Sequence, residues 1–201
     1  MTSARTGARP RWQIAALSSV GFVALLWLIE IIDSLSDDSL QEYGVRPRSD
    51  EGLLGIAFAP LLHGDWTHIE ANTVPALVLG FLVLVSGIVR GLEATGIIWL
   101  VAGIGVWLLA PGNTNHVGVS GLIFGWLVYL MVRGIWTRKV AEILLGIVLF
   151  VAYGSLLLGV LPGQPGISWQ GHLFGALGGA LAAWLVSFDE PARLSERGRQ
   201  R

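Results

Sequence analysis

Long apolar runs separated by short polar stretches dominate the chain. The first run covers residues 14–32 and is interrupted only by Ser18, Ser19, Gly21 and Glu30. It is longer than the ~7–15-residue apolar core of a signal peptide and no small-x-small cleavage site follows, so it predicts an uncleaved membrane helix. Together with the later runs it predicts six membrane-spanning helices, at residues 14–32, 67–89, 94–110, 118–132, 140–161 and 170–188.

A shorter apolar stretch, at residues 52–62, does not fit this pattern. Its 11 residues are too few to cross about 30 Å of hydrocarbon. We therefore expect this stretch to lie at the membrane interface or to enter the membrane and return on the same side.

The positive charges predict how this all-α bundle is oriented. Six spans place both termini on one side, and of the 13 Lys and Arg residues only Arg46 and Arg48 fall in the connections on the other side. Because positive residues collect on the cytoplasmic side, we expect both termini there. The chain then divides into a cytoplasmic segment at 1–13, a six-helix transmembrane domain at 14–188 and a charged cytoplasmic tail at 189–201.

The composition also indicates a polytopic membrane protein. The sequence is 53% hydrophobic and 13% charged, whereas soluble domains are about 25% charged. The net charge of −1, without a basic patch interleaved with aromatic residues, gives no indication of nucleic-acid binding. The absence of cysteine excludes disulfides and thiolate-bound metals. We expect the lipid bilayer, and not nucleic acid, to be the partner of most of the surface.

Polar groups mark the predicted outer ends of several helices. Ser120 stands between Gly118 and Gly121 where a polar loop enters an apolar helix, and His172 opens the last helix. A serine hydroxyl becomes an effective nucleophile when a histidine takes its proton, and an ionisable side chain in a membrane span is a functional candidate. The pattern predicts a serine–histidine hydrolase. It is not a Gly-x-Ser-x-Gly elbow, because Leu122 occupies the place of the last glycine.

Glycines at four-residue spacing suggest how the serine and the histidine meet. Two helices carry such ridges, at Gly171, Gly175 and Gly179 and at Gly121 and Gly125. Small residues at this spacing let two membrane helices pack closely, which would bring His172 within reach of Ser120. No carboxylate is placed to complete a triad, so we predict a dyad.

A third polar group opens another helix. His68 and Asn72 are four residues apart on one helix face, and their donors suit an oxyanion hole together with the backbone N–H of Ser120. His63 precedes this helix and is expected to border the same cavity.

The helix that begins near Ser120 is expected to be short. Its 15 residues would be only about 22 Å long, against about 30 Å of hydrocarbon. We therefore expect the serine to lie below the outer membrane surface, in a recessed cavity open to water.

Structural roles for the same residues remain open. A serine at a helix start is commonly an N-cap, glycine ridges can serve packing alone, and His68 and Asn72 could bond across helices. Neither a metal nor another cofactor is expected, because the histidines lack the His-Glu-x-x-His spacing and no carboxylate ligand is evident. Glu70 lies about 200° around the helix from His68 and should face away, and Asp65 is expected to be a helix-start residue.

As a set, the motifs resemble those of rhomboid intramembrane serine proteases in their minimal six-helix bacterial form. The likeness covers residues 52–187 and rests on His63-x4-His68-x3-Asn72, Gly118-Val119-Ser120-Gly121 and Gly171-His172-x2-Gly175. The resemblance implies Ser120 as nucleophile, His172 as general base, and His68, Asn72 and the Ser120 amide as the oxyanion site. It also implies that Phe124, one turn after the serine, packs on the catalytic imidazole.

Two positions depart from the family pattern. The Trp-Arg pair that often occurs in the first loop is missing, and Arg46-Pro47-Arg48 is found in that loop instead. Ala59 stands where some members carry a histidine. Neither departure touches the serine–histidine dyad.

The resemblance implies an endopeptidase that cleaves a peptide bond in or near the transmembrane helix of another membrane protein, through an acyl-enzyme. Its site would face the extracytoplasmic side of a bacterial plasma membrane, and substrate would enter by motion of the helix at 140–161 or the loop at 162–166. One alternative is a non-catalytic protein of the same fold that binds transmembrane helices, which predicts a missing serine or histidine. A transporter would instead favour internal repeats. The substrate and the oligomeric state stay open.

Overall fold

The computed structural model describes residues 9–164 and 166–199, with side chains up to residue 187. Within these residues all regular structure is helical, and an isolated backbone bridge joins Val45 and His116. The predicted all-α fold is therefore confirmed. The elements, with η for a 3-10 segment, are α1 (Arg11–Leu35), η1 (Ser39–Tyr43), α2 (Asp50–Phe58), η2 (Ala59–Leu61), α3 (Trp66–Val85), α4 (Ile88–Leu109), α5 (Ser120–Thr137), α6 (Val140–Tyr153), η3 (Gly154–Val160) and α7 (Trp169–Arg199).

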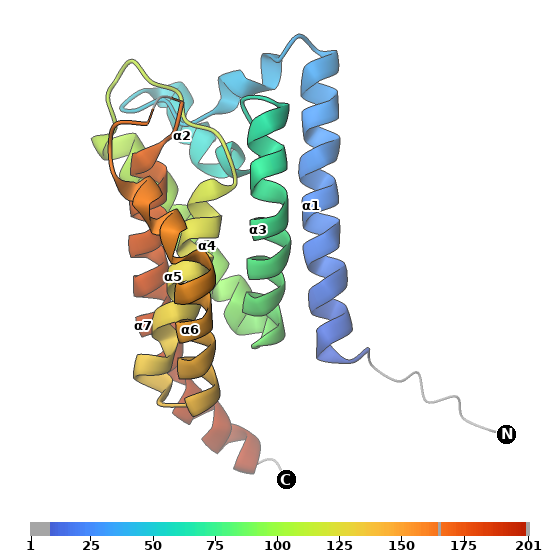
Figure 1. The fold of residues 1–201 in the computed structure, drawn as a ribbon, viewed down its shortest axis with the longest axis vertical. Coiled ribbons are helices and arrows are strands. Elements are labelled where there is room, and N and C mark those ends of the chain that lie inside the picture. Colours follow the sequence, from blue (N-terminus) through green and yellow to red (C-terminus); the bar gives the residue numbers. More distant parts are fainter. Residues whose placement is uncertain (1–8, 165, 200–201) are drawn as a thin grey trace, which may run out of the picture.

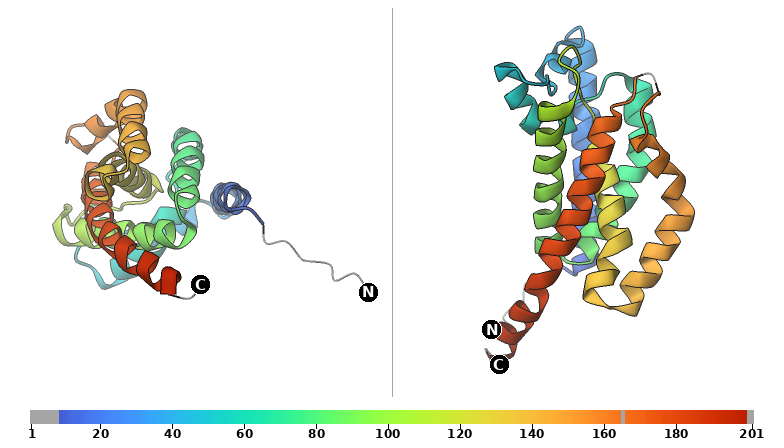
Figure 2. Two further views of the ribbon diagram at one scale, coloured as in Figure 1. Left: turned by 90° about the horizontal axis from the view of Figure 1, so that it is seen from below. Right: turned by 90° about the vertical axis from the view of Figure 1, so that its left-hand side faces the viewer.

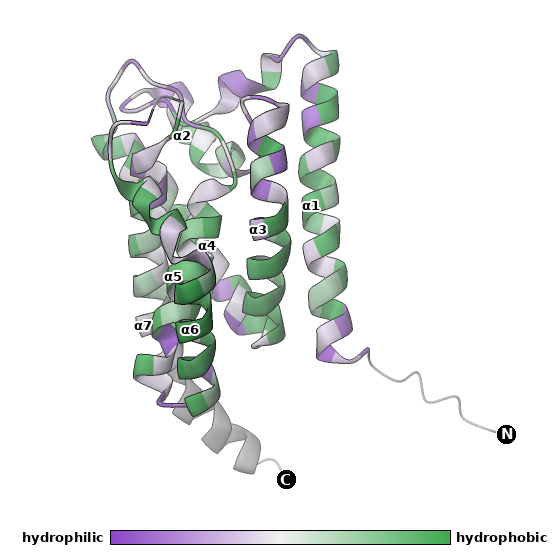
Figure 3. Ribbon diagram, in the orientation of Figure 1, coloured by the Kyte–Doolittle hydropathy of each residue, from purple (hydrophilic) through white to green (hydrophobic). Residues whose placement is uncertain are grey.

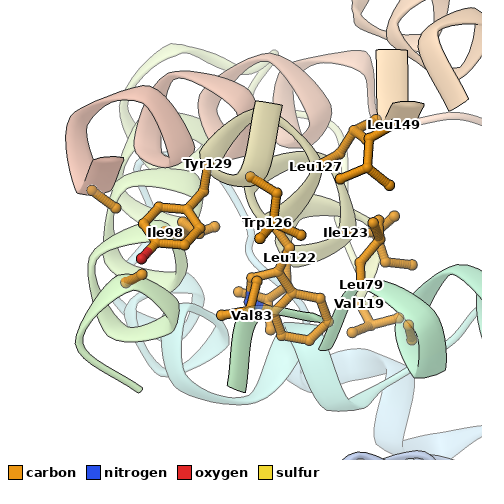
Figure 4. Close-up of a cluster of buried hydrophobic side chains, with 14 of the residues drawn as sticks. Leu79, Val83, Ile98, Val119, Leu122, Ile123, Trp126, Leu127, Tyr129 and Leu149 are labelled. Carbon is orange, nitrogen blue, oxygen red and sulfur yellow. The ribbon is translucent and has the colours of Figure 1, made fainter. Parts of the chain in front are cut away.

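Helix α5 lies at the centre of the bundle, and α1 lies at its edge beside α3 (Figures 1 and 2). In the most apolar stretch of α5 61% of the residues are buried, against 11% in the stretch formed by α6 and η3. Figure 4 shows the apolar side chains of α5 among those of the surrounding helices, which include Leu79 and Val83 of α3, Ile98 of α4 and Leu149 of α6. The first residue of this central helix is Ser120.

Five helical segments of the described chain are long and apolar enough to cross a membrane: α1, α3, α4, α5, and α6 continued by η3. Hydrophobic residues cover these helices, and many of the polar residues gather in the connections at their ends (Figure 3). The protein is therefore an integral membrane protein. The last predicted helix forms as α7, which lies against α4 and α5.

The boundary that we predicted between the second and third spans is wrong. Helix α3 ends at Val85 rather than at residue 89, and α4 begins at Ile88 rather than at residue 94. Gly87 makes this short connection possible, because its φ of 157° is one that a residue with a side chain rarely adopts.

The predicted end of the fourth span is also wrong. Helix α5 has 18 residues instead of 15, which gives a length of about 27 Å. It continues through Arg133 because this guanidinium is buried and pairs with Glu142 of α6 through two N···O contacts of 2.9 and 3.0 Å. A paired arginine does not need to leave the helix bundle for water.

The short apolar stretch that was expected not to span forms α2 and η2, and neither is among the candidate spans. Gly52 lies directly on the preceding loop, where a Cβ would collide with the carbonyl oxygen of Arg46.

Arg48, which lies in the loop without the Trp-Arg pair, caps the end of α4. Its Nη1 donates to the carbonyl oxygens of Leu108 at 3.0 Å and Ala110 at 2.8 Å.

Candidate active site

Ser120 begins α5 directly after a tightly held loop. Gly118 has a φ of 119°, in the region that favours glycine, and its N–H donates to the carbonyl oxygen of Ala59 at 2.9 Å. A Cβ at Gly118 would lie 2.7 Å from Cε1 of His68 and 3.7 Å from Oγ of Ser120. The glycine therefore lets the His68 ring and the serine hydroxyl lie on the same side of the loop.

The hydroxyl of Ser120 forms a hydrogen bond with His172 of α7. Its Oγ lies 2.9 Å from Nε2 of the imidazole. The other ring nitrogen, Nδ1, lies 3.0 Å from the carbonyl oxygen of Gly159. A carbonyl only accepts, so Nδ1 carries the hydrogen, and in a neutral imidazole Nε2 is then the acceptor. The Ser120 hydroxyl therefore donates to His172, as proton transfer from serine requires.

Phe124 supports this imidazole from one face. Its ring is stacked on His172 with centroids 3.9 Å apart and an interplanar angle of 10°. Phe124 lies one turn after Ser120 on α5, so the helix that carries the serine also orients the histidine ring. This is the contact that the resemblance implied.

The two glycine ridges face each other between α5 and α7, as their spacing predicted. A Cβ on Gly175 would collide with the carbonyl oxygen of Gly121, and a Cβ on Gly179 would collide with that of Gly125. Such close approach is possible only because Gly175 and Gly179 have no side chain. The contact brings the first turns of the two helices together, where Ser120 and His172 meet.

His68 and Asn72 lie in the first two turns of α3. Asp65 caps this helix, because its Oδ1 accepts from the N–H of His68 at 2.8 Å, as expected for a helix-start residue. Asn72 is buried, and its Nδ2 has no hydrogen-bond partner among the described residues. A buried donor without a partner is costly, which marks this amide as a candidate binding group.

His63 lies beside His68 and is only 1% exposed. The two rings meet edge to face with centroids 5.1 Å apart. Burial, together with a smaller effect of the neighbouring His68, lowers the pKa of His63 to about 3 against the opposing effect of Asp65. His63 therefore stays neutral at physiological pH. Its contact with His68 places it at the border of the candidate site.

A small cavity of about 50 Å³ reaches Ser120 from the side of α2 and α4, which is room for more than one water molecule. Most of its lining is apolar, with His116 and Ser168 among the polar exceptions. Ser120 itself is half-buried. The serine is thus recessed, and the surface beside it is drier than we expected. Among the described residues, no three His, Asp or Glu side chains are grouped to hold a metal ion.

The sequence places these elements in a known family. A family model described as the rhomboid domain matches residues 50–188. The chain belongs to the rhomboid family. Uncharacterized proteins of Mycobacterium tuberculosis and Mycobacterium bovis are each 49% identical to this rhomboid chain over 194 residues, which is 92% of it and 81% of the relative. Rhomboid-like protein 11, chloroplastic, of Arabidopsis thaliana is 32% identical over 150 residues, which is 64% of this chain and 51% of the relative. No solved structure matches the present chain.

Sequence reasoning missed one group at the candidate site, the carbonyl of Gly159. It lies in η3, which follows α6, and it is the group that contacts Nδ1 of His172. Every residue has such a carbonyl, so no pattern in the sequence could distinguish this one.

Proposed function

We propose that this rhomboid protein is an intramembrane serine endopeptidase that hydrolyses a peptide bond in or near the transmembrane segment of another membrane protein. Ser120 is the nucleophile and His172 the general base. The observation that carries the proposal is the 2.9 Å contact between Ser120 Oγ and His172 Nε2, together with the Gly159 carbonyl that leaves Nε2 free to accept a proton. An activated serine needs a base in this state.

The proposed reaction follows from these positions. As Oγ of Ser120 attacks the substrate carbonyl carbon, its proton passes to Nε2 of His172. The oxygen of the tetrahedral intermediate takes up negative charge and is stabilised by the N–H of Ser120, the amide of Asn72 and the ring of His68. His172 then protonates the leaving amine, which leaves an acyl-enzyme. Water attacks the acyl carbon with His172 again as base and restores the serine.

The proposed topology has six spans, with α7 as the sixth, both termini in the cytoplasm of a bacterium and the site toward the extracytoplasmic side. The start of α1 and the end of α7 lie at one end of the bundle (Figure 1), and α3, α5 and α7 all begin at the opposite end. The residues proposed for catalysis come from those three helix starts. Arg90, in the first turn of α4, and Arg138 and Lys139, between α5 and α6, lie at the end where α1 starts, as expected for a cytoplasmic face.

We expect substrate to enter past α6 or the loop at 162–166. The stretch formed by α6 and η3 is the least buried of the candidate spans. A disulfide engineered between α3 and α6 should therefore block cleavage of a transmembrane substrate until it is reduced. Full cleavage with that disulfide closed would rule out this entry route.

The central test uses a fluorophosphonate probe on the detergent-solubilised protein. Wild type should be labelled, whereas Ser120→Ala and His172→Ala should be unlabelled although both retain the wild-type unfolding transition. The same three proteins, reconstituted with a model transmembrane substrate, should show cleavage by wild type alone. A folded wild type that neither labels nor cleaves would refute the proposal and favour a protein that binds transmembrane helices without cutting them.

A further inference from the structure

His116 lies four residues before Ser120 and uses both of its ring nitrogens. Nδ1 lies 2.7 Å from Oγ of Ser168, and Nε2 lies 2.7 Å from Oγ1 of Thr114. The sequence gives this histidine no place in the dyad or the oxyanion site. The contacts nevertheless connect the loop that leads to the serine with the residue that precedes α7.

The direction of these hydrogen bonds follows from the groups at their ends. The Thr114 hydroxyl donates to the carbonyl oxygen of Pro111 at 2.6 Å, so its oxygen accepts from Nε2–H of His116. In the neutral imidazole Nδ1 then accepts, and it accepts from the Ser168 hydroxyl. Burial lowers the pKa of His116, which favours this neutral form. Each ring nitrogen of His116 thus has one partner of the right kind.

Ser168 in turn holds the start of α7. Its Oγ accepts from the N–H of Gly171 at 3.1 Å, and its carbonyl oxygen accepts from the N–H of His172 at 3.1 Å. Ser168 therefore acts as an N-cap for the turn that carries the proposed base. A shift of its side chain would move the first turn of α7.

The backbone of His116 is fixed as firmly as its ring. Its N–H donates to the carbonyl oxygen of Val45 at 3.0 Å, and its carbonyl oxygen accepts from the N–H of Val45 at 2.9 Å. The ring thus projects from a braced backbone, which suits it to hold another element in place. Further along the two helices, the glycine contacts already hold α5 and α7 together.

We propose that His116 is a positioning residue that holds the start of α7, through Ser168, at the distance from α5 that Ser120 and His172 need. This inference rests on the proposed protease function. His116 touches neither reacting atom. It acts on the rate because a displacement of about 1 Å at a reacting centre can cost 10²-fold.

The test compares variants by their rate of fluorophosphonate labelling, separated into the maximal rate and the probe concentration at half-saturation. His116→Ala and Ser168→Ala should each lower the maximal rate roughly ten- to a hundredfold, with little change in half-saturation. The double variant should be no slower than the slower single variant, because both remove one connection. His116→Asn keeps an acceptor near the position of Nδ1 and should recover most of the rate. His116→Gln keeps a donor near the position of Nε2 and should not.

Asn115→Ala is the matched control. It removes a hydrogen bond from the same loop, in which Asn115 Nδ2 donates to the carbonyl oxygen of Gln41 at 2.7 Å, but this bond does not reach α7. Its labelling rate should stay within about twofold of wild type. If His116→Ala does not fold, Ser168→Ala and His116→Asn provide the comparison.

The outcomes separate this inference from the function on which it rests. A labelled wild type with an equally fast His116→Ala, an additive double variant, or a Gln variant as active as the Asn variant would each overturn the positioning role alone. A folded wild type that is not labelled would overturn the proposed function and this inference together.

Discussion

Replacing Gly175 by alanine tests whether the close contact between α5 and α7 sets the geometry of the site. The new Cβ would collide with the carbonyl oxygen of Gly121 and would lie 2.8 Å from its carbonyl carbon and 3.1 Å from its Cα. These are backbone atoms of a central helix and cannot turn away. The two helices must therefore separate by roughly 0.7 to 1.2 Å before the shortest carbon–carbon contact reaches the normal distance of about 3.5–4.0 Å.

Both stability and reactivity should respond to this separation. Overpacking of this kind costs about 1–3 kcal/mol, which should lower the unfolding midpoint in detergent. The contact between Ser120 and His172 starts at 2.9 Å, so the same movement takes it beyond hydrogen-bond range. Fluorophosphonate labelling should consequently slow by roughly 10²-fold.

Two further alanine variants serve as controls. Gly96 of α4 has no atom within 4 Å of the added Cβ, so Gly96→Ala should leave labelling and stability unchanged or slightly improved. At Gly121 the added Cβ would lie 3.3 Å from the carbonyl oxygen of Gly171 and 3.5 Å from Cβ of Ala102, so Gly121→Ala should have a small effect. If Gly175→Ala melts and labels like wild type, the helices are not in backbone contact and the reasoning fails.

Three further predictions concern other contacts. Gly159→Ala places a Cβ 2.9 Å from Cζ of Phe124 and 3.1 Å from Nδ1 of His172 and should slow labelling at least about tenfold, as part of the ~10²–10⁴ that a general base contributes. Arg133→Met removes the buried partner of Glu142, whose carboxylate keeps the Thr137 hydroxyl at 2.7 Å, and should cost about 1–3 kcal/mol in unfolding measurements. Because the pKa of His63 falls from 6.5 to about 3 on folding, the folded protein binds fewer protons than the unfolded chain between these values. The contribution of His63 to stability should be full above pH 6.5 and should be lost with decreasing pH by up to about 1.4 kcal/mol per unit, and His63→Phe should remove this part of the slope.

The first two of these predictions each have a matched control variant. Gly154→Ala in the same 3-10 segment meets only the ring of Phe150, at 3.4 Å or more, and should label normally. Lys139→Met removes a half-exposed ammonium 3.8 Å from the same carboxylate and should cost less than about 1 kcal/mol. An unchanged pH slope in His63→Phe, an Arg133→Met variant as stable as Lys139→Met, or equal labelling of the two 3-10 segment variants would contradict the respective argument.

Part of the candidate site could be predicted because its chemistry resides in side chains. Ser120, His172, His68 and Asn72 each stand at the polar start of an apolar helix, and the structure places the first two in hydrogen-bond contact. Their catalytic roles remain predictions. The glycine spacing predicted which two helices approach, since small residues at four-residue spacing form a flat strip on a helix.

Helix ends were predicted less well where one residue departs from its usual behaviour. Polarity at Arg133 suggested a turn, but pairing with Glu142 lets α5 continue to Thr137. The connection at Gly87 is shorter than the apolar pattern suggests, since glycine accepts a backbone conformation that other residues avoid.

The sequence by itself determined that this is a helical membrane protein, since a chain in hydrocarbon must satisfy its backbone hydrogen bonds within its own helices. It also determined the side-chain types available for catalysis. Only the tertiary structure decided that the Gly159 carbonyl orients His172, that Gly175 is crowded while Gly121 has room, and that His116 reaches Ser168. Backbone carbonyls and glycines are chemically the same at every position. What distinguishes them is a neighbour from a distant part of the chain, and packing alone selects that neighbour.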